Sequence, residues 1–160
     1  FFVDPYNSLR IDIAQGKNIS SHEYHYEAAS EFLTFSNRMN MAVWLNMHAV
    51  TEAQRLKGED GLPVAPSAAM TEGGGKFVNR ADCFLTFHRK VSSPEYDIRK
   101  TMEFHVRKIR ETETGGECTV WNEPFRFRMN ESNTGFSTYT TQGSLYEPLM
   151  LKRIQGELVL

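Results

Sequence analysis

Two cations near the end of an apolar strand pattern have the spacing needed to bind a phosphate. Lys108 and Arg110 stand two residues apart, and a Thr-Gly-Gly turn follows at residues 114–116. Alternate side chains of a strand point to the same side, so both cations should project together from the strand's end. An arginine placed in this way can neutralise phosphoryl charge in a transition state. The alternative is a solvated basic edge, which would also include Arg107, Arg126 and Arg128.

A second candidate site lies at the start of the chain, where an apolar run over residues 1–3 ends in Asp4. We expect a fully buried strand there. Ligands of open α/β sheets bind at the carboxyl ends of strands, and a carboxylate there can hold Mg²⁺ through water. Asn7 is the most plausible polar residue to assist Asp4. The alternative for Asp4 is an aspartate that begins a turn before proline.

His48 ends a second apolar run, over residues 42–47, which we expect to form the next strand. A polar residue at that point can sense a bound phosphate or relay its state to the segment that follows. The alternative is a hydrogen-bonded histidine at a strand end. Asp4 and His48 thus stand at equivalent places in two expected strands.

The segment from residue 51 to 76 is long and poor in periodic structure, which is typical of a functional or mobile loop. It offers cationic side chains and a run of backbone amides, which can bind nucleic-acid phosphates without reading sequence. No aromatic residue lies among the basic ones, which disfavours base stacking. The alternative is a flexible surface loop. The candidate residues are Arg55, Lys57, Gly73, Gly74, Gly75 and Lys76.

Composition limits the classes of protein to consider. The 160 residues suffice for one domain with a core, and a net charge of −2 means that any nucleic-acid site must be local. Neither a signal peptide nor a long apolar run is present, so neither secretion nor membrane spanning is indicated. Cys83 and Cys118 lack metal-ligand spacing, and a reducing, cytoplasmic context fits best. Because the chain starts inside an apolar run, we expect it to be a piece of a longer protein.

The elements that would position these residues alternate between strand and helix patterns. Ser20 and Glu23 form a capping-box signature, which predicts a helix over about residues 22–39. His22 and His25 near its start are expected on a solvated face rather than at a metal. A helical turn is expected over 76–80, and strands are expected over 83–88, 100–110 and 124–130. Residues 145–160 are expected to form a tail or a helix. This order predicts an α/β fold with a mostly parallel sheet and antiparallel edge strands.

Four segments follow one another as in a known family. The chain resembles the RecA-like ATPase core of DnaB-type replicative helicases, and more closely the helicase or primase–helicase proteins of bacteriophages and mobile elements. The resemblance covers residues 1–130, and residues 131–160 would be a C-terminal extension. The matching segments are 1–7 (FFVDPYN, the Walker B strand), 44–50 (WLNMHAV, the sensor strand), 72–89 (EGGGKFVNRADCFLTFHR) and 105–116 (HVRKIRETETGG).

The resemblance implies the C-terminal part of a RecA-like P-loop NTPase core that binds ATP and Mg²⁺ between subunits of a ring, expected to be a hexamer. Asp4 would hold Mg²⁺ through water, and His48 would couple phosphate state to the 51–76 loop on single-stranded DNA. Lys108 and Arg110 would reach the neighbour's nucleotide. A primase partner is left open, and the isolated chain should be inactive.

The chain departs from the family's pattern in three places. The Walker A lysine and threonine and the catalytic glutamate, which lie upstream of Walker B, are absent. His48 stands where glutamine is common, and the loop has Thr71-Glu72-Gly73-Gly74 in place of Arg-Glu-Ser-Gly. Two alternatives remain: a non-enzymatic nucleic-acid-binding or recombination module on a degenerate RecA fold, and a metal-dependent nuclease using Asp4 and Asp82 with histidines.

Overall fold

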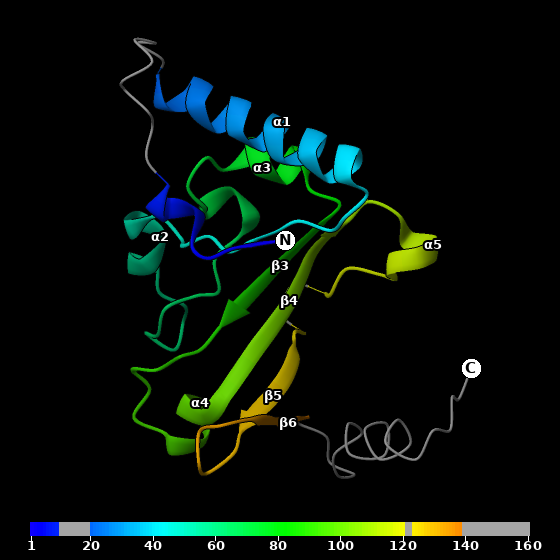
Figure 1. Ribbon diagram of the computed structural model, residues 1–160. Helices are drawn as coiled ribbons and strands as arrows, with labels where there is room; N and C mark the ends of the chain where they lie inside the picture. The colour runs from blue at the N-terminus through cyan, green and yellow to red at the C-terminus, as the bar shows by residue number, and fades with distance from the viewer. Residues whose placement is uncertain (10–19, 121–122, 139–160) are drawn as a thin grey trace, which may run out of the picture.

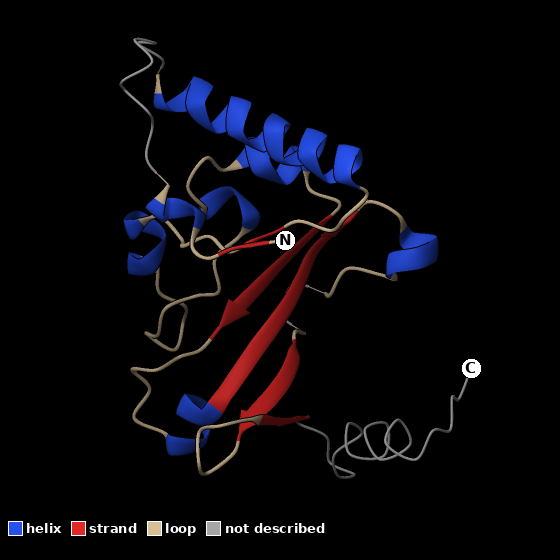
Figure 2. Ribbon diagram, in the orientation of Figure 1, coloured by secondary structure: helices blue, strands red, loops and turns tan. Residues whose placement is uncertain are grey.

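The computed structural model describes residues 1–9, 20–120 and 123–138, which form an α/β fold (Figure 1). Its helices gather at one end of the molecule, and a long antiparallel sheet extends away from them (Figure 2). The strands are β1 (Phe2–Val3), β2 (Trp44–Leu45), β3 (Cys83–His88), β4 (Thr101–Ile109), β5 (Phe125–Met129) and β6 (Phe136–Thr138). The helices are α1 (Ser21–Met39), α2 (Thr51–Arg55), α3 (Gly75–Arg80), α4 (Tyr96–Lys100) and α5 (Thr112–Gly115), with 3-10 turns η1 (Tyr6–Ser8) and η3 (Ala68–Met70).

Helix α1 begins at the capping box expected from the sequence. The Ser20 hydroxyl accepts from the Glu23 amide at 3.2 Å, and the Glu23 carboxylate accepts from the Ser20 amide at 3.0 Å. The helix ends at Asn40, whose φ of 47° is the left-handed conformation common at helix ends. The predicted helix over 22–39 is therefore confirmed. Its buried face lies on α3 and contributes Ala29 to a core that also contains Tyr6 and Phe77.

Strands β1 and β2 are parallel neighbours, with Phe2 opposite Trp44 and Val3 opposite Leu45. The strands predicted over 1–3 and 42–47 are present but only two residues long each. The expectation of a fully buried first strand is wrong, since Phe2 is 71% exposed. The reason is that β1 pairs only with β2 among the described residues, and Phe2 stacks on Trp44, which is itself 49% exposed.

The second sheet has the order β3-β4-β5-β6, and all its pairs are antiparallel. The predicted strands over 83–88, 100–110 and 124–130 are confirmed, as is the helical turn over 76–80. The expected mostly parallel sheet is only partly matched, because two of the described strands are parallel and four are antiparallel. Consecutive strands joined by short connections can pair only in the antiparallel sense, and β3 to β6 follow one another in this way.

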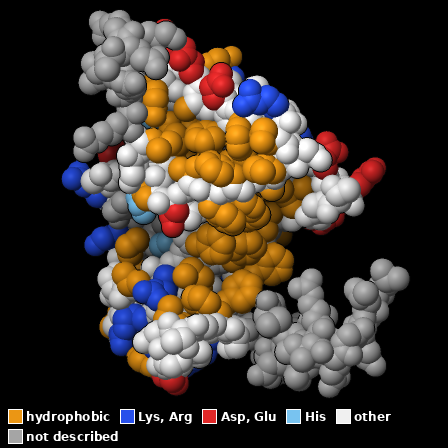
Figure 3. All heavy atoms as spheres, in the orientation of Figure 1, with side chains coloured by type: hydrophobic (Ala, Val, Ile, Leu, Met, Phe, Trp, Pro, Cys, Tyr) orange, Lys and Arg blue, Asp and Glu red, His pale blue; other side chains and the backbone are white. Residues whose placement is uncertain are grey.

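The two faces of the second sheet differ in chemistry. Phe87, Phe104 and Phe125 lie opposite one another on β3, β4 and β5, with ring centroids 4.9 and 6.3 Å apart. The other face carries Thr86 and His105, both buried. Figure 3 shows hydrophobic side chains gathered over the strands and continuing toward α1. The expected pairing of Phe104 and Val106 on one face agrees with this alternation.

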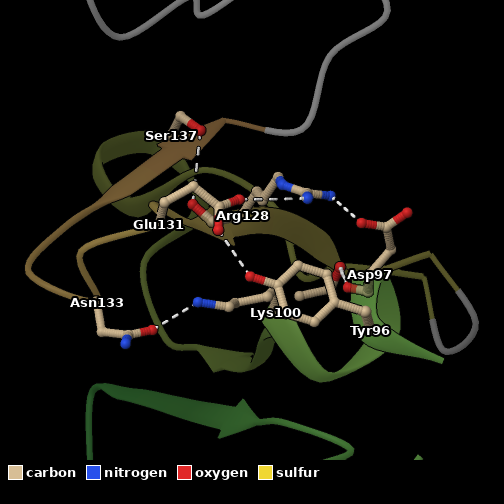
Figure 4. Close-up of polar contacts among 8 residues, drawn as sticks. Tyr96, Asp97, Lys100, Arg128, Glu131, Asn133 and Ser137 are labelled. Carbon is tan, nitrogen blue, oxygen red and sulfur yellow. Dashed lines mark hydrogen bonds and ion pairs between the residues drawn. The ribbon is translucent and has the colours of Figure 1, made fainter. Parts of the chain in front are cut away.

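Polar contacts join α4 to the far end of β5, as Figure 4 shows. Arg128 forms an ion pair with Asp97 at 2.6 Å, and the Tyr96 hydroxyl donates to Glu131 at 2.7 Å. Lys100 donates to the Asn133 side chain at 2.7 Å. These contacts fix the corner where β5 turns into β6.

Beyond residue 130 the sheet continues through β6, so the described part of the predicted extension pairs with β5. The division into 1–130 and 131–160 stays a prediction, and the tail or helix expected over 145–160 lies outside the described residues. The segment over 51–76 is more regular than expected, because it contains α2, η3 and the first turn of α3. No helix in the described ranges combines the length and apolarity needed to cross a membrane.

Candidate functional site

The carboxyl ends of β1 and β2 form one edge, and two predicted residues follow them there. The chain leaving β1 stays beside the chain leaving β2, since the Asn46 amide donates to the Val3 carbonyl at 2.9 Å and the Tyr6 amide donates to the Asn46 carbonyl at 2.8 Å. Asp4 and His48 are both exposed at this edge. Parallel pairing therefore places an accessible carboxylate and an accessible imidazole where ligands of α/β sheets bind.

Asn7 connects this edge to the loop segment. Its side-chain carbonyl accepts from the His48 amide at 2.8 Å, and its side-chain amide donates to the Glu72 carboxylate. One half-buried side chain from the segment after β1 thus touches the segment after β2 and the residue before the glycine run. The predicted residues Asn7 and His48 are brought together by this contact, although the role assigned to each stays a prediction.

Glu72 also faces His25 on α1, which in turn contacts Tyr6. The Tyr6 hydroxyl lies 2.8 Å from His25 Nδ1, and His25 Nε2 lies 3.8 Å from the Glu72 carboxylate. Burial raises the pKa of Tyr6, so its hydroxyl keeps its proton and donates to Nδ1. Burial also lowers the pKa of His25, so the ring is neutral at pH 7. Nε2 then carries the remaining proton and presents it toward Glu72.

The solvated position expected for His25 is wrong, because its side chain is buried. The rings of Tyr6 and Phe77 cover it, with centroids 5.8 and 6.3 Å from the imidazole. No group of three potential metal ligands occurs in the part of the chain that the structure describes. The nuclease alternative therefore gains no ligand set from these residues.

The glycine run forms a tight turn into α3 rather than an open row of amides. Gly73 and Gly74 have φ values of 73° and 45°, which favour glycine. The Gly74 amide donates to the Thr71 carbonyl at 2.9 Å, and the Lys76 amide donates to the Gly73 carbonyl at 3.1 Å. Two of the amides expected to face a phosphate are therefore used within the turn.

A hollow of about 440 Å³ lies beside this turn. It is lined by the three glycines and by the half-buried Lys76, together with His22, His25 and Glu72. Arg55 and Lys57 are exposed and are not among the residues that line it. The structure thus gathers Gly73, Gly74, Gly75 and Lys76 at one surface and leaves Arg55 and Lys57 outside it.

Lys108 and Arg110 leave the end of β4 together, as the strand spacing predicts, and both reach the last turn of α3. Lys108 Nζ lies 2.5 Å from the Val78 carbonyl, and Arg110 Nη2 lies 3.0 Å from the Arg80 carbonyl. Arg110 Nη1 also forms an ion pair with Asp82 at 2.7 Å. In this conformation both cations contact the chain's own backbone.

The sequence alone did not single out the contacts made by Glu72, Tyr6 and Asp82. The Asn7–Glu72 pair spans 65 residues, and no short-range pattern reveals such a pair. One signal was present for Asp82, because it directly follows a predicted helical turn and precedes a strand. An acidic residue there can meet a cation from the neighbouring strand end.

Comparisons with known proteins agree with the fold and go no further. No protein-family model and no curated protein sequence matches the chain. A solved structure of the ATPase domain of a DnaB-like helicase superposes on 77% of this chain with a TM-score of 0.59 and 11% sequence identity. The match covers 39% of that structure, so the chain spans less than half its length. The chain therefore shares its fold with part of an ATPase domain, which supports the RecA-like, helicase-type fold that the sequence resemblance implied.

Proposed function

We propose that this chain is part of the ATPase motor of a ring-shaped, DnaB-type replicative helicase. In such a motor, ATP hydrolysis between subunits drives translocation along single-stranded DNA. Two facts support this function: the fold shared with part of the ATPase domain of a DnaB-like helicase, and the four segments that match the family in order. The motor would work as a ring, expected to be a hexamer, with the phosphate cradle supplied by residues outside this chain.

The observation that carries the proposal is the position of Asn7. Its two hydrogen bonds connect the segment after Asp4, the backbone of His48 and the carboxylate of Glu72. A motor must link the place where phosphate is lost to the place where DNA is held. Here one side chain joins the proposed nucleotide edge to the turn that opens the proposed DNA surface.

Asp4 suits a magnesium ion held through water. It is a single accessible carboxylate at the carboxyl edge of two parallel strands, and Mg²⁺ keeps several waters while using one or two carboxylates and substrate phosphates. The ion would neutralise charge on the ATP phosphates. His48, whose backbone is held by Asn7, would respond to the presence of the terminal phosphate through its exposed ring.

Lys108 and Arg110 would act on the nucleotide of the adjacent subunit. Water attacks the terminal phosphorus, the bond to the bridging oxygen breaks, and negative charge builds on the leaving ADP. Cations supplied from a neighbouring chain stabilise that charge. Their present contacts are with carbonyls and one exposed carboxylate, so a rotation of each long side chain suffices to redirect it.

Single-stranded DNA would be held at the surface formed by Gly73, Gly74, Gly75 and Lys76. Such a surface binds phosphates and does not read bases. Binding should therefore weaken steeply as salt is raised, since each phosphate contact releases counterions. Arg55 and Lys57 would add long-range attraction from outside the hollow.

The test is ATP turnover by the full-length polypeptide, with and without single-stranded DNA. We expect Asp4→Ala and Arg110→Ala each to abolish most DNA-stimulated turnover. In a mixture of the two variants, an intact site of one subunit can meet an intact arginine of its neighbour, so partial recovery is expected. Asn7→Ala should reduce the stimulation by DNA while leaving basal turnover measurable.

The control is Asn133→Ala, which removes an exposed asparagine that accepts from Lys100 at the far end of the sheet. Its turnover should match wild type. No recovery in the mixture would contradict a site shared between subunits. Absence of turnover in the intact protein, with DNA binding retained, would contradict the motor as a whole.

One observation favours the non-enzymatic alternative. The side chains of Lys108 and Arg110 already satisfy carbonyls at the end of α3, which is a structural role that needs no nucleotide. On that alternative, both substitutions would destabilise the fold and leave DNA affinity as the only function to measure.

A further inference from the structure

The two cations of β4 contact the carboxyl end of α3 through three of its last carbonyls. Lys108 Nζ lies 2.5 Å from the Val78 carbonyl and 3.5 Å from that of Asn79, and Arg110 Nη2 lies 3.0 Å from that of Arg80. The last carbonyls of a helix have no partner within it, and cations are favoured there. The end of α3 is therefore a holder for both side chains.

Asp82 completes this holder on the side of Arg110. Its carboxylate lies 2.7 Å from Nη1, and its backbone carbonyl accepts from the Arg110 amide at 2.8 Å. The side chains of Arg110 and Asp82 are 41% and 70% exposed. An ion pair so exposed adds little stability. What it does fix is the direction in which the guanidinium points, because one nitrogen is bound to Asp82 and the other to Arg80.

The opposite end of α3 lies in the proposed DNA surface. The helix begins at Gly75 and has six residues, so it spans about 9 Å from the glycine turn to the two cations. Phe77 in its first turn is buried against Tyr6, with ring centroids 4.6 Å apart. A short helix held in this way moves as one body. A shift at the turn over residues 73–76 is then passed to the carbonyls that hold Lys108 and Arg110.

We propose that Asp82 is a positioning residue for Arg110, and that together with α3 it makes the direction of Arg110 depend on DNA bound at the 73–76 turn. This inference rests on the proposed function, because it assumes that Arg110 acts on a neighbour's nucleotide. It adds a residue and a route. Asp82 touches no substrate and acts only through the arginine.

The experiment compares two ion pairs of nearly equal geometry in the full-length polypeptide. Asp82→Asn removes the charge beside Arg110. Asp97→Asn removes the charge beside Arg128, where the distance is 2.6 Å and the carboxylate side chain is 66% exposed (Figure 4). The second variant is the matched control, because it lies on α4 and contacts neither α3 nor the two cations of β4. The measurements are kcat and KM for ATP, each with and without single-stranded DNA.

We expect Asp82→Asn to lower the DNA-stimulated kcat about ten-fold, as misplacement of a charge-stabilising group does. KM for ATP should stay at the wild-type value, since the variant's own nucleotide site is intact. Asp97→Asn should stay within about two-fold of wild type. Asp82→Glu, which keeps the charge, should recover part of the loss. In mixed rings, Asp82→Asn should be complemented by Asp4→Ala, as Arg110→Ala is.

Three results would overturn the inference while leaving the motor intact. These are a loss in Asp82→Asn no greater than that in Asp97→Asn, a loss that Asp4→Ala subunits do not complement, and an equal loss with and without DNA. A different result separates the two proposals. If Arg110→Ala itself turns over ATP at the wild-type rate, the shared site fails first, and the role of Asp82 fails with it.

Discussion

At the scale of single residues, a chain of polar side chains links three parts of the sequence. It runs from Tyr6 through His25 and Glu72 to Asn7, and then to the backbone of His48. A net hydrogen bond contributes about 1 kcal/mol, but leaving a buried partner unsatisfied costs about 1–3 kcal/mol. Removing any member therefore affects its neighbours more than its own bond suggests.

The buried His25 should make the stability of the protein depend on pH. Its pKa is lowered by burial, with a smaller contribution from nearby Lys76 and His22 and an opposing one from Glu72. Above the unfolded-state pKa of about 6.5, both states are neutral and stability is complete. As pH falls below that value, the unfolded chain takes up the proton first, so stability is lost.

We therefore expect Tm to fall between pH 7.5 and 5.5, and to fall less in His25→Gln. Thermal unfolding at both pH values measures this difference. His22→Gln is the matched control, because it alters an exposed histidine on the same helix. An equal fall in Tm for wild type and His25→Gln would contradict the role given to His25. The lowered pKa of buried His105 should account for part of the remaining dependence.

At the scale of elements, α3 has the largest consequence for its size. It contacts α1 on one side, carries the glycine turn at its start, and holds two cations at its end. A helix of six residues is not stable by itself in water. Its neighbours must therefore hold it in place, and the side chain that anchors it is Phe77.

Two nearby glycines separate the needs of this helix from the needs of a DNA surface. A Cβ at Gly73 would lie 2.8 Å from the Phe77 ring at a φ of 73°, whereas a Cβ at Gly75 would meet nothing within 4 Å. We expect Gly73→Ala to destabilise the protein by about 1–3 kcal/mol. Gly75→Ala should be neutral or slightly stabilising. Thermal unfolding of both variants, with single-stranded DNA binding measured beside it, makes the comparison.

Gly75→Ala keeps every backbone amide of the turn, so it should also keep DNA affinity. A stable Gly75→Ala protein that no longer binds DNA would show that phosphate approaches closer than a methyl group allows. A Gly73→Ala protein as stable as wild type would contradict the packing described for Phe77.

At the scale of the whole molecule, the chain contains one side of each proposed contact. The carboxyl edge of β1 and β2 offers a metal-binding carboxylate but no phosphate cradle, and β4 offers cations for a different subunit. Exposed aromatic side chains gather over the strands (Figure 3). Large exposed apolar areas usually mark surfaces that other protein covers. Phe2, Phe87 and Phe125 are the most exposed of these aromatics.

This division leads to an expectation for the chain in isolation. Residues 1–160 alone should release no phosphate from ATP, because the sequence holds no glycine-rich loop ending in Gly-Lys-Ser or Gly-Lys-Thr. A phosphate-release assay on the purified chain, with Asp4→Ala as the control, measures this. Turnover by the chain that Asp4→Ala abolishes would show a complete site within these residues.

The sequence by itself determined the elements whose signals are local. The capping box set the start of α1, and the β-branched and aromatic runs set β3, β4 and β5, because hydrogen bonding and side-chain alternation act over a few residues. The order of four segments also indicated the fold of an ATPase domain. The joint projection of Lys108 and Arg110 followed from strand geometry alone.

Only the tertiary structure decided which residues meet. Asn7 and Glu72, His25 and Tyr6, and Arg110 and Asp82 are pairs separated by many residues, and their contacts depend on how α1 and α3 lie against the strand ends. The burial of His25 and the exposure of Phe2 were misjudged for the same reason. A residue's own pattern gives its side of an element, whereas burial depends on what the rest of the chain places against that side.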